Sequence, residues 1–265
     1  MSSLVTVERL RDGVALLTLR RPEKLNALTW DMMRSFLSSL EDLGRDESVR
    51  VVVLTGEGRG FCAGLDIGQD DGVGSRADVF SAYRGQETVA QLALTVRNLP
   101  QPVIAAVNGP ASGGGMAITL ASDIRICAPQ ARFNVAFVRI GLSGADAGVS
   151  HLLPRIVGLG MASELMLTGR QVLADEALRI GLANRVVPAE ALLDEAAALA
   201  GQIAQNSPFG VFMTKQVLHR NVDAGSLEQA IELENRTQIL ASRTEDMPEA
   251  LAAFKEKRSP NFKGR

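Results

Sequence analysis

The chain has 265 residues, of which 46% are hydrophobic and 22% are charged. This length and balance are those of a soluble globular protein with a sizeable core, and they exclude disordered and fibrous chains. A formal net charge of -2, from 28 basic and 30 acidic side chains, gives no general attraction to nucleic acid or to an anionic membrane. The composition therefore predicts neither a nucleic-acid partner nor a membrane partner.

Two cysteines and two histidines are too few for a disulfide scaffold or a Cys/His zinc site. The first residues lack a basic segment followed by an apolar one, and no stretch reaches the roughly 18 apolar residues that span a bilayer. We therefore expect no metal, no export signal and no membrane anchor, and we expect the protein in a reducing cytoplasm.

The chain opens with strand and helix patterns that have clear local signals. Residues 5–19 predict a β-hairpin that turns at Asp12-Gly13, because Asp-Gly supplies the positive φ of a tight turn. The apolar spacing that follows predicts a helix that Thr29 caps and that ends before Gly44.

Alternation of buried strands and helices then continues through the first half. Residues 49–54 are a β-branched run, which is typical of a strand buried on both faces. A helix is expected over residues 77–98, a strand over 103–107, a helix after Gly113 and a strand over 124–127. This order predicts βαβ units on a largely parallel sheet, which is an α/β fold.

Helical patterns dominate the last third of the chain. The expected helices cover residues 162–167, 174–180, 189–205, 208–221 and 227–242. Pro188 and Pro208 punctuate this region, but no flexible linker separates it from the first part. We expect residues 1–200 to form the core and residues 201–265 to form a helical C-terminal region.

A first glycine-rich segment, residues 56–67, follows a predicted strand. It contains G-x-G-x-x-A from Gly58 to Ala63, but a dinucleotide-binding motif needs a helix to begin within it. Gly64 and the polar loop after it argue against such a helix. The alternatives are a mobile glycine-rich turn, or a backbone held so that one amide, near Leu65, points at a ligand atom.

A second glycine cluster, Gly113, Gly114 and Gly115, opens a predicted helix. N–H groups at a helix start, with no side chain to block approach, bind negatively charged oxygens well. No Lys-Ser or Lys-Thr follows the glycines, which excludes a Walker loop. The alternative is close packing of the helix on the sheet. Two glycine-rich strand ends in one sheet can together supply two amides to one oxyanion.

Asp146 is a lone acid among small, mostly apolar residues. Such an acid is expected to be desolvated, which suits it to proton transfer near neutral pH. The alternative is that Asp146 caps the helix that runs on to Leu153. Covalent serine catalysis at Ser143 is not expected, because the nucleophile elbow is incomplete and the only nearby histidine, His151, lies on the same segment.

Other charged residues are expected to be solvated. They include Asp66, Asp70 and Asp71 in the loop after the first glycine-rich segment. The basic tail over residues 254–265 is also expected in solvent, and it is a natural counter-charge for a phosphate-bearing ligand.

Six short motifs follow one another along almost the whole chain. They are RPEKLNAL at 21–28, GRGFCAGLDI at 58–67, VNGPASGGG at 107–115, LLPR at 152–155, LTG at 167–169 and RSPNF at 258–262. In their order and spacing they resemble the crotonase, or enoyl-CoA hydratase/isomerase, superfamily. The resemblance implies a spiral of ββα units and a helical C-terminal region that forms a homotrimer, often as a dimer of trimers. It also implies an acyl-CoA thioester as ligand, with no other cofactor.

The resemblance also implies which residues form the site. By motif match, the backbone N–H groups of Leu65 and Gly114 form an oxyanion hole for the thioester oxygen. The residues implied to line the coenzyme A site are Lys24, Leu25, Ala63, Asp66, Ile67 and Gly113. Lysine or arginine side chains of the tail are implied to reach the phosphates of coenzyme A.

Two departures from the family's hydratases bear on the reaction. Those enzymes carry two glutamates, and the matching positions here hold Ala117 and Phe137, neither of which can transfer a proton. Asp146 falls where a single Asp serves in isomerases of phenylacetate degradation and in aryl-CoA dehalogenases. Ala90 stands where our alignment places the auxiliary histidine of the dehalogenases.

The resemblance therefore favours a Δ3,Δ2-enoyl-CoA isomerase in which Asp146 is the acid/base. Bond migration takes a proton from C2 and returns one to C4, so one carboxylate serves both steps and no water is consumed. The alternatives are an enoyl-CoA hydratase with an unconventional site and a catalytically silent acyl-CoA-binding protein.

Overall fold

The structure is a computed structural model that describes residues 3–68 and 78–265. Within these residues the centre is a six-stranded sheet in the order β1-β2-β3-β4-β6-β9. A hairpin of antiparallel strands forms one edge, and the remaining strands are parallel. The strands are β1 (Val5–Arg11), β2 (Val14–Leu19), β3 (Val51–Gly56), β4 (Val103–Val107), β6 (Ile124–Cys127) and β9 (Arg185–Val186). The expected α/β fold with a largely parallel sheet is confirmed.

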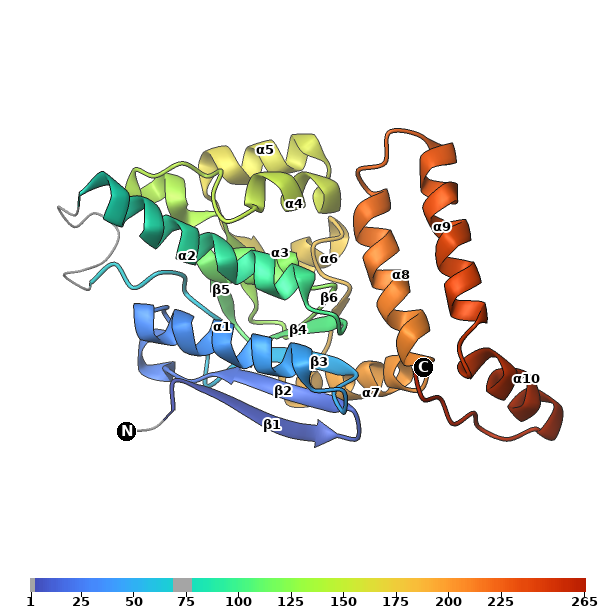
Figure 1. Ribbon diagram of the computed structural model, residues 1–265. Helices are drawn as coiled ribbons and strands as arrows, with labels where there is room; N and C mark the ends of the chain where they lie inside the picture. The colour runs from blue at the N-terminus through green and yellow to red at the C-terminus, as the bar shows by residue number, and fades with distance from the viewer. Residues whose placement is uncertain (1–2, 69–77) are drawn as a thin grey trace.

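Helices cover both faces of this sheet (Figure 1). α1 (Trp30–Arg45), α2 (Val79–Asn98) and α3 (Gly114–Ala121) lie on one face, and α7 (Leu192–Ala204) lies on the other. Side chains alternate along each strand, so β3 sends Val52 and Leu54 into the first core and Val51 and Val53 into the core under α7. The uninterrupted apolar run of β3 is thereby explained.

The first two long helices, α1 and α2, each begin at a residue whose side chain caps the helix. The side chain of Thr29 accepts a hydrogen bond from the N–H of Met32 at 3.2 Å and caps α1 as expected. The expected end before Gly44 is wrong, because α1 continues to Arg45 and Gly44 instead gives room to Leu99. Asp78 caps α2, and the expected start at residue 77 lies outside the described residues.

Several short elements surround the main sheet. A three-stranded sheet has the order β5-β7-β8 in the described part of the chain. Its strands are β5 (Pro110–Ser112), β7 (Arg132–Asn134) and β8 (Val172–Leu173). The helices between β7 and β8 are η2 (Ala136–Ile140), α4 (Val149–Val157) and α5 (Leu159–Thr168), and α6 (Ala174–Arg179) follows β8.

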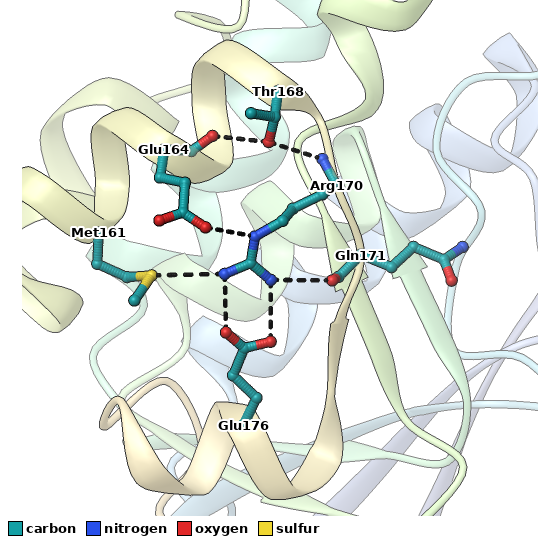
Figure 2. A network of polar contacts seen from close by, with 6 residues as sticks. All are labelled: Met161, Glu164, Thr168, Arg170, Gln171 and Glu176. Carbon is teal, nitrogen blue, oxygen red and sulfur yellow. Dashed lines mark hydrogen bonds and ion pairs between the residues drawn. The ribbon is translucent and has the colours of Figure 1, made fainter.

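Arg170 joins the end of α5 to α6 (Figure 2). Its Nε donates to Glu164 at 2.6 Å, and its two terminal nitrogens donate to Glu176 at 2.9 and 2.7 Å. The same nitrogens also donate to the carbonyl oxygen of Gln171 at 3.3 Å and to the sulfur of Met161 at 3.8 Å. Every N–H of the guanidinium therefore has an acceptor, and the turn between the two helices is held by one side chain.

The helical C-terminal region begins with a helix on the sheet, and its later helices stand to one side (Figure 1). It contains η3 (Ala189–Ala191), α7, α8 (Pro208–Asn221), α9 (Leu227–Ser242) and α10 (Asp246–Glu256). The expected boundary at residue 200 falls inside α7, which packs on the sheet, and a division of the chain there stays a prediction. None of the helices in the described ranges is both long and apolar enough to cross a membrane.

A buried ionic cluster anchors α8 to the core. Lys215 on α8 lies 2.8 Å from one oxygen of Asp123, and His219 lies 2.9 Å from the other. Lys215 also donates to the carbonyl oxygen of Gln101 at 2.9 Å. Burial lowers the pKa of Lys215, so its ammonium depends on these partners for compensation.

Candidate active site

Three segments that are distant in the sequence lie side by side near one end of the sheet. The N–H of Ala63 donates to the carbonyl oxygen of Leu25 at 2.9 Å, and the N–H of Leu28 donates to that of Gly64 at 2.7 Å. On the other side, the N–H of Ser112 donates to the carbonyl oxygen of Cys62 at 2.9 Å. The first glycine-rich segment is thus held between residues 25–28 and the strand that leads to the second.

Two asparagine side chains hold the turn that leads into this arrangement. Asn26 Nδ2 donates to the carbonyl oxygen of Gly60 at 2.8 Å. Asn108 Nδ2 donates to the carbonyl oxygens of Gly56 and Gly58, both at 2.8 Å, and to that of Gly60 at 3.2 Å. No helix begins between residues 58 and 63, all of which the structure describes, so the dinucleotide-binding alternative is wrong.

Gly64 brings the two predicted amide donors close together. It has a φ of +92°, and a Cβ there would lie 2.8 Å from the carbonyl oxygen of Ser112 and 3.4 Å from the nitrogen of Gly114. Leu65 follows directly, and Gly114 is the first residue of α3, with Gly113 as its N-cap. Within residues 3–68 and 78–265, neither the Leu65 N–H nor the Gly114 N–H has a hydrogen-bond acceptor. Both are therefore available to a ligand oxygen.

The sequence predicts that Asp66 is solvated, but in the structure its carboxylate is largely buried. Its carboxylate lies 2.7 Å from Arg21 Nη1, and both side chains are only 16% exposed. The hydrogen bond from Arg21, with a second from the N–H of Gly68, lowers the pKa of Asp66. Sequence reasoning treated Asp66 as an isolated loop acid because its partner lies 45 residues earlier. Asp70 and Asp71 lie outside the described residues.

The other residues predicted for coenzyme A fall into two groups. Lys24 ends the short helix η1 (Pro22–Lys24) and lies near enough to Asp66 to act on its charge, and Leu25, with a φ of +51°, is paired with Ala63. Ile67 comes next in the chain and is 68% exposed. Gly113 also has a φ of +51°, at the start of α3, and lies on the other side of Gly64.

Apolar side chains occupy the two positions where the resemblance places glutamates in hydratases. Ala117 is fully buried in α3, one turn after Gly113. Phe137 in η2 is 4% exposed, and its ring carbon Cε1 would lie 3.5 Å from a Cβ on Gly113. The start of α3 is therefore lined at these positions by groups that cannot exchange a proton.

Asp146 lies in the loop between η2 and α4 and is half-buried, so the expected desolvation is only partial. Its Oδ1 accepts hydrogen bonds from Gln86 Nε2 of α2 and from the N–H of Ala147, the latter at 2.7 Å. The helix-cap alternative is wrong, because α4 begins after Gly148 without a side-chain cap. The backbone carbonyl of Asp146, not its carboxylate, accepts from Val149 N–H at 2.9 Å.

Helix α2 connects Asp146 with the Leu65 segment. A Cβ on Gly85 would lie 3.0 Å from Trp30 Cη2, so α2 packs closely on the residue that begins α1. Trp30 lies two residues after Leu28, whose backbone pairs with Gly64 and Asp66. Gln86, directly after Gly85, holds Asp146. Sequence reasoning missed Gln86, because nothing local marks an exposed helical glutamine as the partner of a distant acid.

A serine hydrolase site is not present at Ser143. Its hydroxyl accepts a hydrogen bond from the N–H of Ala145 at 3.1 Å. His151 Nε2 lies 3.7 Å from Asp223 Oδ2, so this histidine is paired with an acid and not with Ser143. The expected exclusion of a serine nucleophile is consistent with these contacts.

Fold and site together define an α/β protein of the crotonase type, with two paired glycine-rich segments near one end of the sheet and a helical C-terminal region. The sequence model of the family described as Enoyl-CoA hydratase/isomerase matches residues 9–265. The chain therefore belongs to the enoyl-CoA hydratase/isomerase family and is an enzyme of that family.

Known proteins similar to this chain carry two kinds of names. It is 44% identical over 265 residues to the "Probable enoyl-CoA hydratase echA12" of Mycobacterium bovis, covering 98% of this chain and 93% of the relative. It is 38% identical over 255 residues to the 1,2-epoxyphenylacetyl-CoA isomerase of Escherichia coli, covering 96% of each. A crystal structure of a probable enoyl-CoA hydratase/isomerase from Mycobacterium abscessus has a TM-score of 0.91 and 42% identity, covering 99% of this chain and 100% of the other.

Proposed function

We propose that the protein is a Δ3,Δ2-enoyl-CoA isomerase in which Asp146 is the only acid/base. The observation that carries this proposal is the apolar filling of the start of α3 by Ala117 and Phe137, together with a half-buried carboxylate at Asp146. A hydratase needs groups that position and activate water, whereas bond migration needs one group that carries a proton. The similarity to a protein named 1,2-epoxyphenylacetyl-CoA isomerase supports an isomerisation of a coenzyme A thioester.

The proton transfers follow from the position of the double bond. The Asp146 carboxylate removes a proton from C2 of a 3-enoyl thioester, and the electron pair delocalises onto the thioester oxygen as a dienolate. The Asp146 carboxylic acid then returns a proton to C4, and the double bond moves from C3–C4 to C2–C3. The carboxylate is restored at the end of the cycle, and no water is consumed.

The dienolate oxygen is proposed to bind between the free N–H groups of Leu65 and Gly114. These donors belong to a rigid pairing of three segments, so they need no rearrangement as the negative charge develops. Loss of one such donor typically costs about 3 to 4 kcal/mol of transition-state stabilisation. Because both donors are backbone groups, side-chain substitution at Leu65 does not remove them.

The proposal also includes the ligand site and the assembly. Lys24 adds positive charge beside the Arg21–Asp66 pair, which suits the phosphates of coenzyme A. α9 has no buried residue, and its apolar residues Leu227, Ile231, Ile239 and Leu240 are exposed. We propose that a second copy of the chain covers them, in a homotrimer or a dimer of trimers.

Product identification with a panel of thioesters tests the proposed reaction. The purified enzyme would be incubated with 3-hexenoyl-CoA and with 2-hexenoyl-CoA, the isomeric products separated by chromatography, and a gain of water detected by mass. We expect conversion of the former into the 2-enoyl isomer without a gain of water. Asp146→Asn is expected to lose this turnover while it still binds the thioester. Full turnover in that variant would exclude the proposal.

An enoyl-CoA hydratase is the second candidate, because several relatives carry that name. It requires Asp146 to orient a water molecule in place of the two missing glutamates. Conversion of 2-hexenoyl-CoA into a product heavier by one water, faster than bond migration, would favour it. Binding without turnover or proton exchange at C2 in deuterated water would instead favour a silent acyl-CoA-binding protein.

A further inference from the structure

The contacts of the Asp146 carboxylate differ between its two oxygens. Oδ1 accepts two hydrogen bonds, one from Gln86 Nε2 and one from the N–H of Ala147. Oδ2 has no hydrogen-bond donor among the residues that the structure describes. Among these residues, Oδ1 is therefore held by the protein, and Oδ2 is open to a ligand.

We infer that Gln86 is a positioning residue that fixes the Asp146 carboxylate through Oδ1 and thereby assigns the proton transfers to Oδ2. This inference rests on the proposed function and deepens it. Gln86 itself does not touch the reacting atoms. It acts together with the N–H of Ala147: without the Gln86 amide, the carboxylate is held by one hydrogen bond instead of two and turns more easily about its Cβ–Cγ bond.

The geometry around Asp146 supports a positioning role. Gln86 and Asp146 are 60 residues apart, on α2 and on the loop before α4, so the hydrogen bond fixes two separate elements relative to each other. Ala147, the second donor, has a φ of +45°, which is rare for a residue with a side chain. Such backbone conformations persist where the surroundings hold them, and here the result is an N–H directed at the acid.

The orientation of the Asp146 carboxylate matters because this one group carries out both proton transfers of the proposed reaction. The oxygen that receives the proton from C2 must deliver a proton to C4 before the dienolate leaves. If Oδ1 is occupied by donors, Oδ2 performs both transfers, and part of the hydrogen removed from C2 reappears at C4. A freely rotating carboxylate loses more of that hydrogen to solvent, so the transfer ratio reports the orientation of Asp146.

Gln86→Met tests the inference, because methionine keeps the length of the side chain and removes the amide donor. Gln91→Met on the same helix is the matched control, since Gln91 lies beside α1 near Leu40 and Glu41 and away from Asp146. Both variants would be assayed with 3-hexenoyl-CoA carrying deuterium at C2. Their thermal midpoints would be compared with that of the wild type to establish equal folding.

We expect Gln86→Met to lower kcat by between about tenfold and a hundredfold with little change in KM, because misplacement of a catalytic group by about 1 Å has effects of this size. The fraction of deuterium recovered at C4 is expected to fall as well. Gln91→Met is expected to match the wild type in both measurements. In the Asp146→Asn background, Gln86→Met is expected to have no further effect, because it acts through the acid.

Three results would overturn the inference and leave the proposed function intact. They are a wild-type kcat in Gln86→Met, an unchanged deuterium fraction, or a further fall in the residual turnover of the double variant, each alongside an Asp146→Asn variant that has lost most of its turnover. Full turnover in Asp146→Asn would instead remove the proposed function together with this inference. The two failures are therefore distinguished by the same set of variants.

Discussion

Gly115 packs directly against the backbone of Cys62. A Cβ on Gly115 would lie 2.1 Å from the carbonyl oxygen of Cys62 and 2.8 Å from its Cβ. The glycine cluster at the start of α3 therefore has two separate uses. Gly115 allows the helix to approach the first glycine-rich segment, and Gly114 presents a free N–H. The two alternatives for this cluster, close packing and a helix start open to a ligand oxygen, therefore both apply, each to a different glycine.

Gly115→Ala is expected to be strongly destabilising. The added methyl group meets a backbone oxygen that cannot rotate away, so α3 or the Cys62 segment must shift. We expect the free energy of unfolding to fall by about 3 kcal/mol or more, measured by urea denaturation. Gly160→Ala is the matched control, because a Cβ there meets nothing within 4 Å. Equal stabilities of the two variants would contradict the close packing.

Arg170→Lys tests the connection between α5 and α6. Lysine keeps the charge but cannot form the fork with Glu176 and the bond to Glu164 at once. Because the network is partly solvent-exposed, we expect a loss of about 1 kcal/mol in the free energy of unfolding. Arg45→Lys is the control, since Arg45 is 76% exposed and its acidic partners lie 3.8 and 3.9 Å away. Indistinguishable losses in the two variants would argue against a specific role of Arg170.

The attachment of the C-terminal tail to α10 is expected to depend on pH through Glu249. Arg258 donates to both oxygens of Glu249, at 2.6 and 3.0 Å, and the N–H of Asn261 donates at 2.7 Å. The hydrogen bond from Arg258, followed by that from Asn261, lowers the pKa of Glu249 from 4.5 to about 2. Since the folded-state pKa is the lower one, this stabilisation is complete above pH 4.5 and is lost as the pH falls toward 2.

Hydrogen exchange of the Asn261 amide measures this attachment. After correction for the intrinsic exchange rate, its protection is expected to be constant above pH 4.5 and to decrease as Glu249 becomes protonated. Glu249→Gln serves as the control, and we expect it to show weak protection that does not vary over this range. A pH-independent wild-type amide would show that the carboxylate does not hold the tail.

The elements that the sequence predicted are those with strong local signals. Asp12-Gly13 makes the hairpin, Thr29 caps α1, and the β-branched run of β3 is buried on both sides of the sheet. Strands such as β5, β8 and β9 have only two or three residues, too few for any alternation to be visible. α10 was missed because its start is acidic and contains Pro248 rather than a clear apolar stripe.

In the candidate site, the sequence indicated the separate parts but not their pairing. The glycine clusters and Asp146 were predicted from their own neighbours in the chain. The contacts of Asp66 with Arg21 and of Asp146 with Gln86 join residues 45 and 60 positions apart, and only the folded chain brings them together. This is why Asp66 was expected in solvent and Gln86 was not considered.

The turn held by Asn108 contains a sequence that is prone to deamidation. Asn108 precedes Gly109, and asparagine followed by glycine loses its amide nitrogen readily on ageing, especially when warm. The deamidation-prone pair cannot be removed by substitution of Gly109, because a Cβ there would lie 2.1 Å from the carbonyl oxygen of Arg59. The aspartate so formed would face the three carbonyl oxygens that now receive the amide. A molecule deamidated at this position would have a turn that has lost its donor and gained a repelling charge.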